Sequence, residues 1–187
     1  YMSRITGAFE DRKAFIAFIT GGDPDLETTQ RLIPAMAEAG ADLIEIGIPF
    51  SDPVAEGIVI QEASKRALEN GCNTDRLFDM VKRARLNTDV PLLFMTYLNP
   101  ILIYGKEQFM SRCSECGIDG VIVPDMPFEE KDELADACEK HGVELISMIA
   151  PTSRERIEVI AREAKGFLYC VSSLGVTGVR SSISKDI

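Results

Sequence analysis

The chain has 187 residues, of which 45% are hydrophobic and 27% are charged. This size and composition fit one globular domain, residues 1–187, and argue against disordered, collagen-like and disulfide-scaffold classes. Acidic residues outnumber basic ones by 30 to 20, which gives a formal net charge of −10. Nucleic acids and anionic membranes are bound mainly through Lys and Arg, so neither is an expected partner.

The five cysteines are an odd number, and the first residues lack the apolar segment of a secretion signal. We therefore expect reduced thiols and a cytoplasmic protein. Cys113 and Cys116 have the spacing of half a zinc site, but they lie in a helix-like stretch and His141 is the only histidine. Because a zinc site needs more ligands, we expect buried or half-buried cysteines and no metal.

Short apolar runs alternate along the chain with longer stretches of helical periodicity, which predicts strands separated by helices. In the first predicted helix after a strand, Leu32, Met36 and Ala39 share one face. Two later helices end at Gly71 and Gly117. Strands are predicted at 14–20, 41–50, 90–97, 119–125, 143–151 and 166–175, and helices at 25–40, 62–71, 74–86, 106–117, 128–142 and 153–166, with Ser153 as the N-cap of the last.

Strands that alternate with helices are typical of βαβ units in a parallel sheet. Both a doubly wound open sheet and a (β/α)8 barrel fit this pattern, and the turn TGGDP lacks the dinucleotide fingerprint of many open sheets. Glu45, Asp52, Asp125 and Tyr169 lie within or just after the C-terminal ends of predicted strands, where a TIM barrel holds its active site. We therefore favour an α/β barrel, with about the first six βα units present.

Glu45 is the most informative residue, because it is a carboxylate between Ile44 and Ile46 in an apolar strand. Alternation places its side chain on the predicted inner face with Leu43 and Gly47. Burial without a partner would raise the pKa of this carboxyl and suit it to acid–base chemistry near neutral pH. A structural glutamate held by a partner is the alternative.

The loop after this strand, GIPFSDPVAEG, carries Asp52 and Glu56. Because such loops carry function in barrels, Glu45 and Glu56 form a candidate pair of carboxylates with different environments. Asp52 by itself also fits a turn before a proline. Near the end of the chain, the loop between Gly175 and Gly178 fits either a phosphate-binding segment or an ordinary loop.

Five motifs, in order and spacing, resemble the tryptophan synthase alpha subunit family. The longest is IEIGIPFSDPVAEGIVIQ, at Ile44–Gln61. The others are FITGGDP at 18–24, MTYLNPI at 95–101, GVIVPDMP at 120–127 and YCVSSLGVTGVR at 169–180. The resemblance extends over nearly all residues from about 15 to 182.

This resemblance implies a TIM-barrel lyase of tryptophan biosynthesis that cleaves indole-3-glycerol phosphate to indole and glyceraldehyde 3-phosphate. The reaction is a retro-aldol cleavage by general acid–base chemistry, with no metal and no organic cofactor in this subunit. Glu45 matches the family's acid/base, which protonates indole C3. Glu56 matches a second carboxylate that faces the indole N–H and stabilises the cation that develops on the ring.

The resemblance also implies four substrate-binding residues. Phe18 matches a phenylalanine that lines the indole pocket, and Tyr169 matches a tyrosine near the glycerol phosphate chain. Thr177 matches a threonine of a mobile loop that contacts the second carboxylate when the loop closes. Gly178 matches a glycine whose backbone N–H helps to hold the phosphate.

The family's alpha subunit docks on a PLP-dependent beta subunit in an alpha2-beta2 heterotetramer, and PLP belongs to that partner. Asp52 and the MTYLNP segment match regions of the interface, and Asn99 and Pro100 are expected there on a loop. A simple turn without a docking role is the alternative for Asn99 and Pro100. An alternative function is a non-catalytic partner that binds and activates the beta subunit. Glu45 favours the enzyme, because a binding module has no need of a carboxylate inside a strand.

The chain departs from the family pattern in two ways. Glu56 stands where the family usually has the shorter Asp, and Ile58 stands where proline is common. In addition, the resemblance stops at about residue 182, early in the helix expected after the sixth strand. It thus ends before the last two βα units, which supply the family's main phosphate cradle. We therefore expect a fragment of a longer protein that is catalytically weak and that is either unstable or dependent on association.

Overall fold

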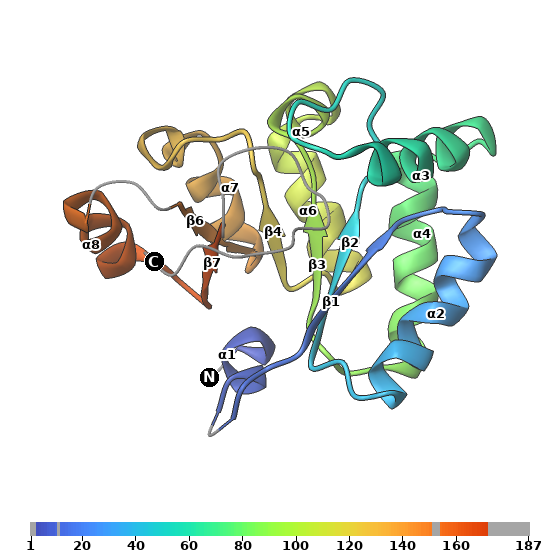
Figure 1. The fold of residues 1–187 in the computed structure, drawn as a ribbon, viewed down its shortest axis with the longest axis horizontal. Coiled ribbons are helices and arrows are strands. Elements are labelled where there is room, and N and C mark those ends of the chain that lie inside the picture. Colours follow the sequence, from blue (N-terminus) through green and yellow to red (C-terminus); the bar gives the residue numbers. More distant parts are fainter. Residues whose placement is uncertain (1–2, 11, 151–153, 172–187) are drawn as a thin grey trace.

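The structure is a computed structural model, and it describes residues 3–10, 12–150 and 154–171 (Figure 1). Ser153, Thr177 and Gly178 therefore lie outside the described residues. The strands are β1 Ile16–Thr20, β2 Leu43–Gly47, β3 Leu92–Met95, β4 Gly120–Ile122, β5 Glu144–Leu145, β6 Ser147–Ile149 and β7 Leu168–Cys170. The helices are α1 Arg4–Ala8, α2 Leu26–Glu38, α3 Ile58–Glu69, α4 Thr74–Ala84, α5 Leu98–Tyr104, α6 Lys106–Cys116, α7 Asp132–His141 and α8 Arg154–Glu163, with short 3-10 turns η1 Arg85–Asn87 and η2 Phe128–Glu130.

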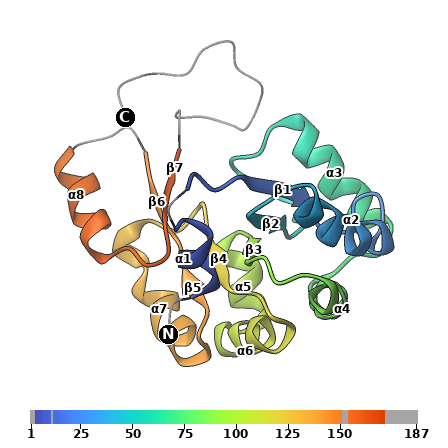
Figure 2. The ribbon, with the colours of Figure 1, turned by 90° about the horizontal axis from the view of Figure 1, so that it is seen from below.

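The strands run parallel, and each pairs with its neighbour in the sequence. The order is β1-β2-β3-β4-β5 in one sheet and β6-β7 in a second. The predicted strand at 143–151 is present as β5 and β6, which Ile146 separates. A doubly wound sheet would reverse its order at a switch point, so the sequential order within each sheet favours the barrel arrangement. Figure 2 shows the strands as an arc with α2 to α8 on its outside.

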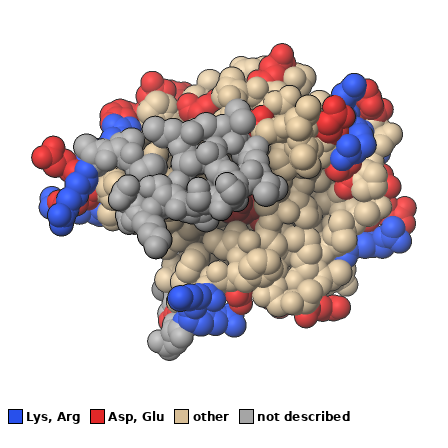
Figure 3. Space-filling model, viewed as in Figure 1, with Lys and Arg blue, Asp and Glu red and all other residues tan. Residues whose placement is uncertain are grey.

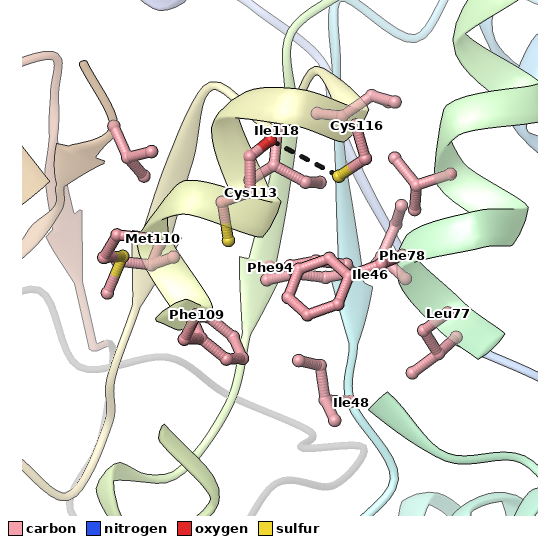
Figure 4. Packing of buried hydrophobic residues seen from close by; sticks show 14 of the residues in the cluster. Ile46, Ile48, Leu77, Phe78, Phe94, Phe109, Met110, Cys113, Cys116 and Ile118 are labelled. Carbon is pink, nitrogen blue, oxygen red and sulfur yellow. Dashed lines mark hydrogen bonds between the residues drawn. The ribbon is translucent and has the colours of Figure 1, made fainter. Parts of the chain in front are cut away.

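Alternating side chains along the strands divide the apolar core into two parts. The outer part lies between the strands and the surrounding helices, and it includes Ile46, Phe78 and Phe94 (Figure 4). Ile44 belongs to the same part. The inner part lies on the opposite face of the strands, within the arc. Its buried members are Ile5, Leu43, Leu93, Ile122 and Ile146.

Helix α1 lies at the end of the arc where the strands begin. The sequence patterns did not predict this helix. Ile5 is fully buried in the inner core, and Figure 2 shows α1 within the arc. A Cβ atom at Gly120 would lie 3.0 Å from the Cδ1 atom of Ile5. A Cβ atom at Gly166 would lie 3.1 Å from its Cγ2 atom. The missing side chains of these two glycines therefore make room for Ile5.

Three expectations from the sequence are corrected by the structure. Asn99 and Pro100 lie in the first turn of α5 and not on a loop. This turn tolerates a proline because the first N–H groups of a helix have no partner within it. In α2, Leu32 is 41% exposed, and the buried positions are Thr29 and Ile33. The other cysteines are buried as expected, whereas Cys170 is exposed.

The surface of the described chain fits the acidic composition. Figure 3 shows acidic and basic side chains interspersed around the edge of one face. The described residues nearer the centre of this face are mostly uncharged. Among the described helices, none has the length and apolarity needed to cross a bilayer.

An ion pair at the N-terminal end of the strands joins segments that are far apart in the sequence. The Arg85 guanidinium donates to Asp119 Oδ2 over 2.8 Å and to the backbone oxygens of Gly117 and Val90 over 2.6 Å each. Asp119 Oδ2 also accepts the N–H of Leu92 at 2.9 Å. Both charged side chains are largely buried, so Arg85 depends on Asp119 for its neutralisation. Asp119 has a second partner, because Arg4 donates to its Oδ1 atom at 3.0 Å.

Replacing Asp119 with Ala leaves Arg85 without its counter-charge and the Leu92 N–H without its acceptor. We expect the free energy of unfolding, measured with urea, to fall by about 3 kcal/mol. The matched control is Glu69→Ala, which removes an exposed ion pair with Lys65. This control should change stability by no more than about 0.5 kcal/mol. Equal effects of the two substitutions would contradict the assigned role.

Candidate active site

The site lies on the inner face of the first two strands. Phe18 in β1 pairs in register with Glu45 in β2, and Thr20 pairs with Gly47. Residues paired in this way point to the same face of a parallel sheet. Leu43, two residues before Glu45, belongs to the inner core. The predicted orientation of Glu45, together with Leu43 and Gly47, is therefore confirmed.

Glu45 is a carboxylate in an apolar environment. Its residue surface is 4% exposed, and its neighbours Ile44 and Ile46 are fully buried on the outer side. Loss of water around the carboxylate raises the pKa of Glu45 from 4.5 to about 7. At neutral pH both the protonated and the ionised form are then populated, which suits a group that gives and takes a proton.

Phe18 lies directly beside Glu45, and Gly47 makes room for it. A Cβ atom at Gly47 would come within 2.7 Å of the Phe18 ring atom Cζ. Phe18 remains 37% exposed, so part of its side chain is not covered by neighbouring residues. Glycine within an otherwise apolar strand is a signal of such a close approach, and this signal identifies Gly47 as a site residue that we had not singled out.

Tyr169 reaches the same interior from the other end of the arc. It lies in β7, pairs in register with Met148 and packs against the inner core. Burial raises the pKa of Tyr169, and the nearby charge of Glu45 raises it further. The structure thus brings Phe18, Glu45 and Tyr169 together, although more than 120 positions of sequence separate the last two.

Glu56 lies in the loop between β2 and α3, just before the N-cap residue Gly57. Burial raises the pKa of its carboxyl. Its Oε2 atom is buried and has no hydrogen-bond partner among the described residues. The Gln61 side chain donates to the backbone oxygen of Glu56 at 2.8 Å and so ties this residue to α3.

The described residues that were predicted at the partner interface are Asp52, Asn99 and Pro100, and none of them is buried. Asp52 is exposed on the same loop, where it accepts a hydrogen bond from the Ser51 hydroxyl. Asn99 is exposed on α5, and Pro100 beside it is half-buried. Among the described residues, no group of three or more His, Cys, Asp or Glu side chains is placed to hold a metal ion.

Two hollows open beside the strand ends, and neither is lined by Glu45 or Glu56. The first has a volume of about 300 Å³ and lies between the segment after β4, the end of β6 and helix α8. The second has a volume of about 370 Å³ and lies between the β2–α3 loop, the start of α4 and helix α5. Its apolar lining includes Ile48, Phe50, Leu77, Pro100 and Ile103.

The sequence of the chain matches a known family model over almost its whole length. This model, described as "Tryptophan synthase alpha chain", matches residues 6–187. The chain belongs to the tryptophan synthase alpha chain family. Among curated relatives, the tryptophan synthase alpha chain of Alkaliphilus metalliredigens is 49% identical, with 100% of this chain and 72% of the relative aligned. That of Halalkalibacterium halodurans is 50% identical, over 100% of this chain and 71% of the relative.

Solved structures of the family share the fold. Tryptophan synthase subunit alpha from Legionella pneumophila superimposes with a TM-score of 0.86 at 41% identity, covering 91% of this chain and 68% of that one. A chain of the tryptophan synthase a2b2 complex from Pyrococcus furiosus gives a TM-score of 0.80 at 38% identity, covering 84% and 65%. These family members confirm the alpha subunit resemblance and the barrel fold.

The raised pKa of Glu45 predicts how stability depends on pH. The folded protein holds a proton on Glu45 more tightly than the unfolded chain does. The free energy of unfolding therefore loses about 3 kcal/mol as the pH rises from about 4.5 to about 7. Glu45→Gln, which cannot ionise, should be free of this loss. We expect the stability difference between variant and wild type in urea to grow by that amount between pH 4.5 and pH 8.

The matched control for this measurement is Glu69→Gln, which alters an exposed glutamate of α3. Its stability difference from the wild type should stay flat over the same pH range. A flat difference for Glu45→Gln as well would show that the carboxylate of Glu45 is solvated or paired.

Proposed function

We propose that the chain cleaves indole-3-glycerol phosphate to indole and glyceraldehyde 3-phosphate, as a carbon–carbon lyase of tryptophan biosynthesis. The observation that carries this proposal is Glu45, a carboxyl group with a pKa of about 7 at the inner face of a family barrel. It lies beside the partly exposed side chain of Phe18 and near the half-buried side chain of Tyr169. An acid–base group next to an aromatic wall suits a planar indole.

Glu45 has the acid–base role in this reaction. Its protonated carboxyl gives a proton to C3 of the indole ring, and the ring becomes a cation that can accept an electron pair. The carboxylate that remains can take the proton from the hydroxyl group next to the ring. The electrons of the C–C bond then return to the ring, the hydroxyl carbon becomes the aldehyde of glyceraldehyde 3-phosphate, and indole leaves. No metal or organic cofactor takes part in these steps.

Glu56 has the electrostatic role. A carboxylate next to the indole N–H stabilises the positive charge that the ring acquires when C3 is protonated. Its buried Oε2 atom accepts no hydrogen bond from the described residues, so it can accept one from this N–H. Phe18 lines the indole pocket and Tyr169 lies near the glycerol phosphate chain. Thr177 and Gly178, which lie outside the described residues, belong to the loop and phosphate contacts of the same proposal.

Removing the acid–base group tests this assignment directly. Glu45→Gln keeps the size of the side chain and removes its proton transfer, so indole release should fall at least 100-fold. Indole release from indole-3-glycerol phosphate by the purified chain is the measurement, with Glu69→Gln as the control that retains the wild-type rate. Wild-type activity in Glu45→Gln would remove Glu45 from the mechanism. A wild-type chain that releases no indole would favour the binding-partner alternative.

Two substitutions at Glu56 separate charge from length. Glu56→Gln should lower the rate about 100-fold or more, because the stabilising negative charge is lost. Glu56→Asp, which keeps the charge and restores the family's usual residue, should stay close to the wild type. Unchanged indole release in Glu56→Gln would remove this residue from the mechanism.

The proposal includes a PLP-dependent beta subunit as partner, in an alpha2-beta2 assembly. The a2b2 complex from Pyrococcus furiosus contains a chain that superimposes on this one. Exposed apolar side chains lie on the β2–α3 loop, at the start of α3 and on α5, namely Val54, Ile58, Val59, Leu102 and Ile103. Asp52, Asn99 and Pro100 lie on the same loop and helix, and we place all of them in the docking face. PLP is bound by the beta subunit in this proposal.

Docking should depend on this face. Asp52→Ala and Ile103→Asp should each weaken the binding of a family beta subunit about tenfold, because an interface tolerates neither a lost polar anchor nor a buried charge. Titration of the chain with that subunit, followed by the stimulation of indole release, measures the effect. Glu69→Ala is the control, and equal midpoints for all variants would place the interface elsewhere.

The cytoplasm is the proposed location. The five cysteines are free thiols, which is typical of proteins in reducing compartments.

A further inference from the structure

We propose that Tyr97 is a positioning residue for Glu56 and acts through a hydrogen bond from the backbone N–H of Ala55 to its hydroxyl oxygen. This inference rests on the proposed function, because it assigns to Tyr97 the task of holding the second carboxylate in place. Tyr97 itself does not touch the reacting atoms in this proposal.

Tyr97 lies where β3 passes into α5. It is the N-cap residue of α5, and it is only 5% exposed. Its ring packs against Phe50, with 5.5 Å between the two ring centroids. Its hydroxyl oxygen lies 3.2 Å from the backbone nitrogen of Ala55. A side chain from the segment after β3 thus reaches 42 positions back to the loop that follows β2.

This hydrogen bond holds the part of the loop that carries the carboxylate. The beginning of the loop is fixed by the Ile48 N–H, which donates to the backbone oxygen of Met95 at 2.9 Å. The end of the loop is fixed where Gln61 donates to the Glu56 oxygen. Between these points the Ala55 N–H, one residue before Glu56, is bound by Tyr97. The hydroxyl therefore limits how far the backbone at Glu56 can move.

Tyr97 is a rigid anchor because α5 is fixed in turn. The N–H of Leu98, the next residue, donates to Asp125 Oδ1 at 2.9 Å, and Asp125 lies in the segment after β4. The N–H of Thr96 donates to the backbone oxygen of Ile122 at 3.0 Å. Tyr97 is thereby held from the β4 side while it holds the loop on the β2 side.

The electrostatic environment keeps this hydroxyl neutral. Burial raises the pKa of Tyr97, and the charges of Glu56 and Asp125 raise it further, against the opposing effect of the Ala55 and Val54 N–H groups. The hydroxyl therefore stays protonated at neutral pH. The influence of Glu56 on this group also shows that the two side chains lie near each other.

Tyr97→Phe tests the inference, because it removes the hydroxyl and keeps the ring on Phe50. We expect kcat for indole release to fall about 3- to 10-fold, with little change in KM, since a displaced Glu56 fails mainly at the charged transition state. The matched control is Tyr104→Phe, which removes a hydroxyl that donates to Asp75 at the other end of α5. This control should keep the wild-type kcat.

A double-mutant cycle distinguishes positioning from a general structural effect. If Tyr97 acts through Glu56, Tyr97→Phe should cause no further loss when it is added to Glu56→Gln, whose residual rate is measured at high enzyme concentration. Full additivity of the two losses, or a wild-type kcat for Tyr97→Phe, would overturn the inference.

Hydrogen exchange provides a readout that does not need catalysis. The Ala55 amide should exchange at least threefold faster in Tyr97→Phe than in the wild type or in Tyr104→Phe, because its acceptor is gone. Unchanged exchange would overturn the inference even if activity fell. A wild-type chain that releases no indole, but shows the faster Ala55 exchange in Tyr97→Phe, would instead count against the proposed function and leave the anchoring contact established.

Discussion

The burial of one carboxylate on the inner face of β2 constrains much of this structure. An ionised Glu45 loses its hydration there, and its raised pKa measures that loss. An apolar residue at this position would pack as well as Leu43 or Leu93 and would carry no such penalty. The strand nevertheless holds the glutamate in place, because its outward neighbours Ile44 and Ile46 are fixed in the outer core. If the two faces of the strand were exchanged, both isoleucines would point to the interior of the arc. The Glu45 carboxylate would then lie among the helices.

The residues around Glu45 divide into those that form the interior and those that keep the loops in position. Gly47 leaves space for the ring of Phe18, and Tyr169 reaches the same space from β7. The loop with Glu56 lacks regular secondary structure, so its geometry depends on contacts from neighbouring strand ends. Tyr97 supplies one of these contacts. At the opposite end, Ile5 and the Arg85–Asp119 pair close and brace the strands.

The family motifs and the strand–helix alternation predicted the architecture well, and the exceptions have physical reasons. Helix α5 was missed because its seven residues include Pro100 and follow an N-cap residue without a side-chain cap. Helix α1 has five residues, too few for a periodic pattern to be visible. In α2, Leu32 belongs to the predicted apolar face and is nevertheless 41% exposed. A helix on the outside of the strands can leave one leucine in water.

The sequence by itself determined the order of the strands along the chain, which side of β2 carries Glu45, and to which family the chain belongs. These properties follow from local periodicity and from the order of motifs along the chain. Only the tertiary structure decided that Glu45 is desolvated beside Phe18 and Tyr169, that Asp119 neutralises Arg85, and that Tyr97 binds the N–H of Ala55. Burial and hydrogen bonding depend on which distant segments meet in space, and closing the arc of strands brings those segments together.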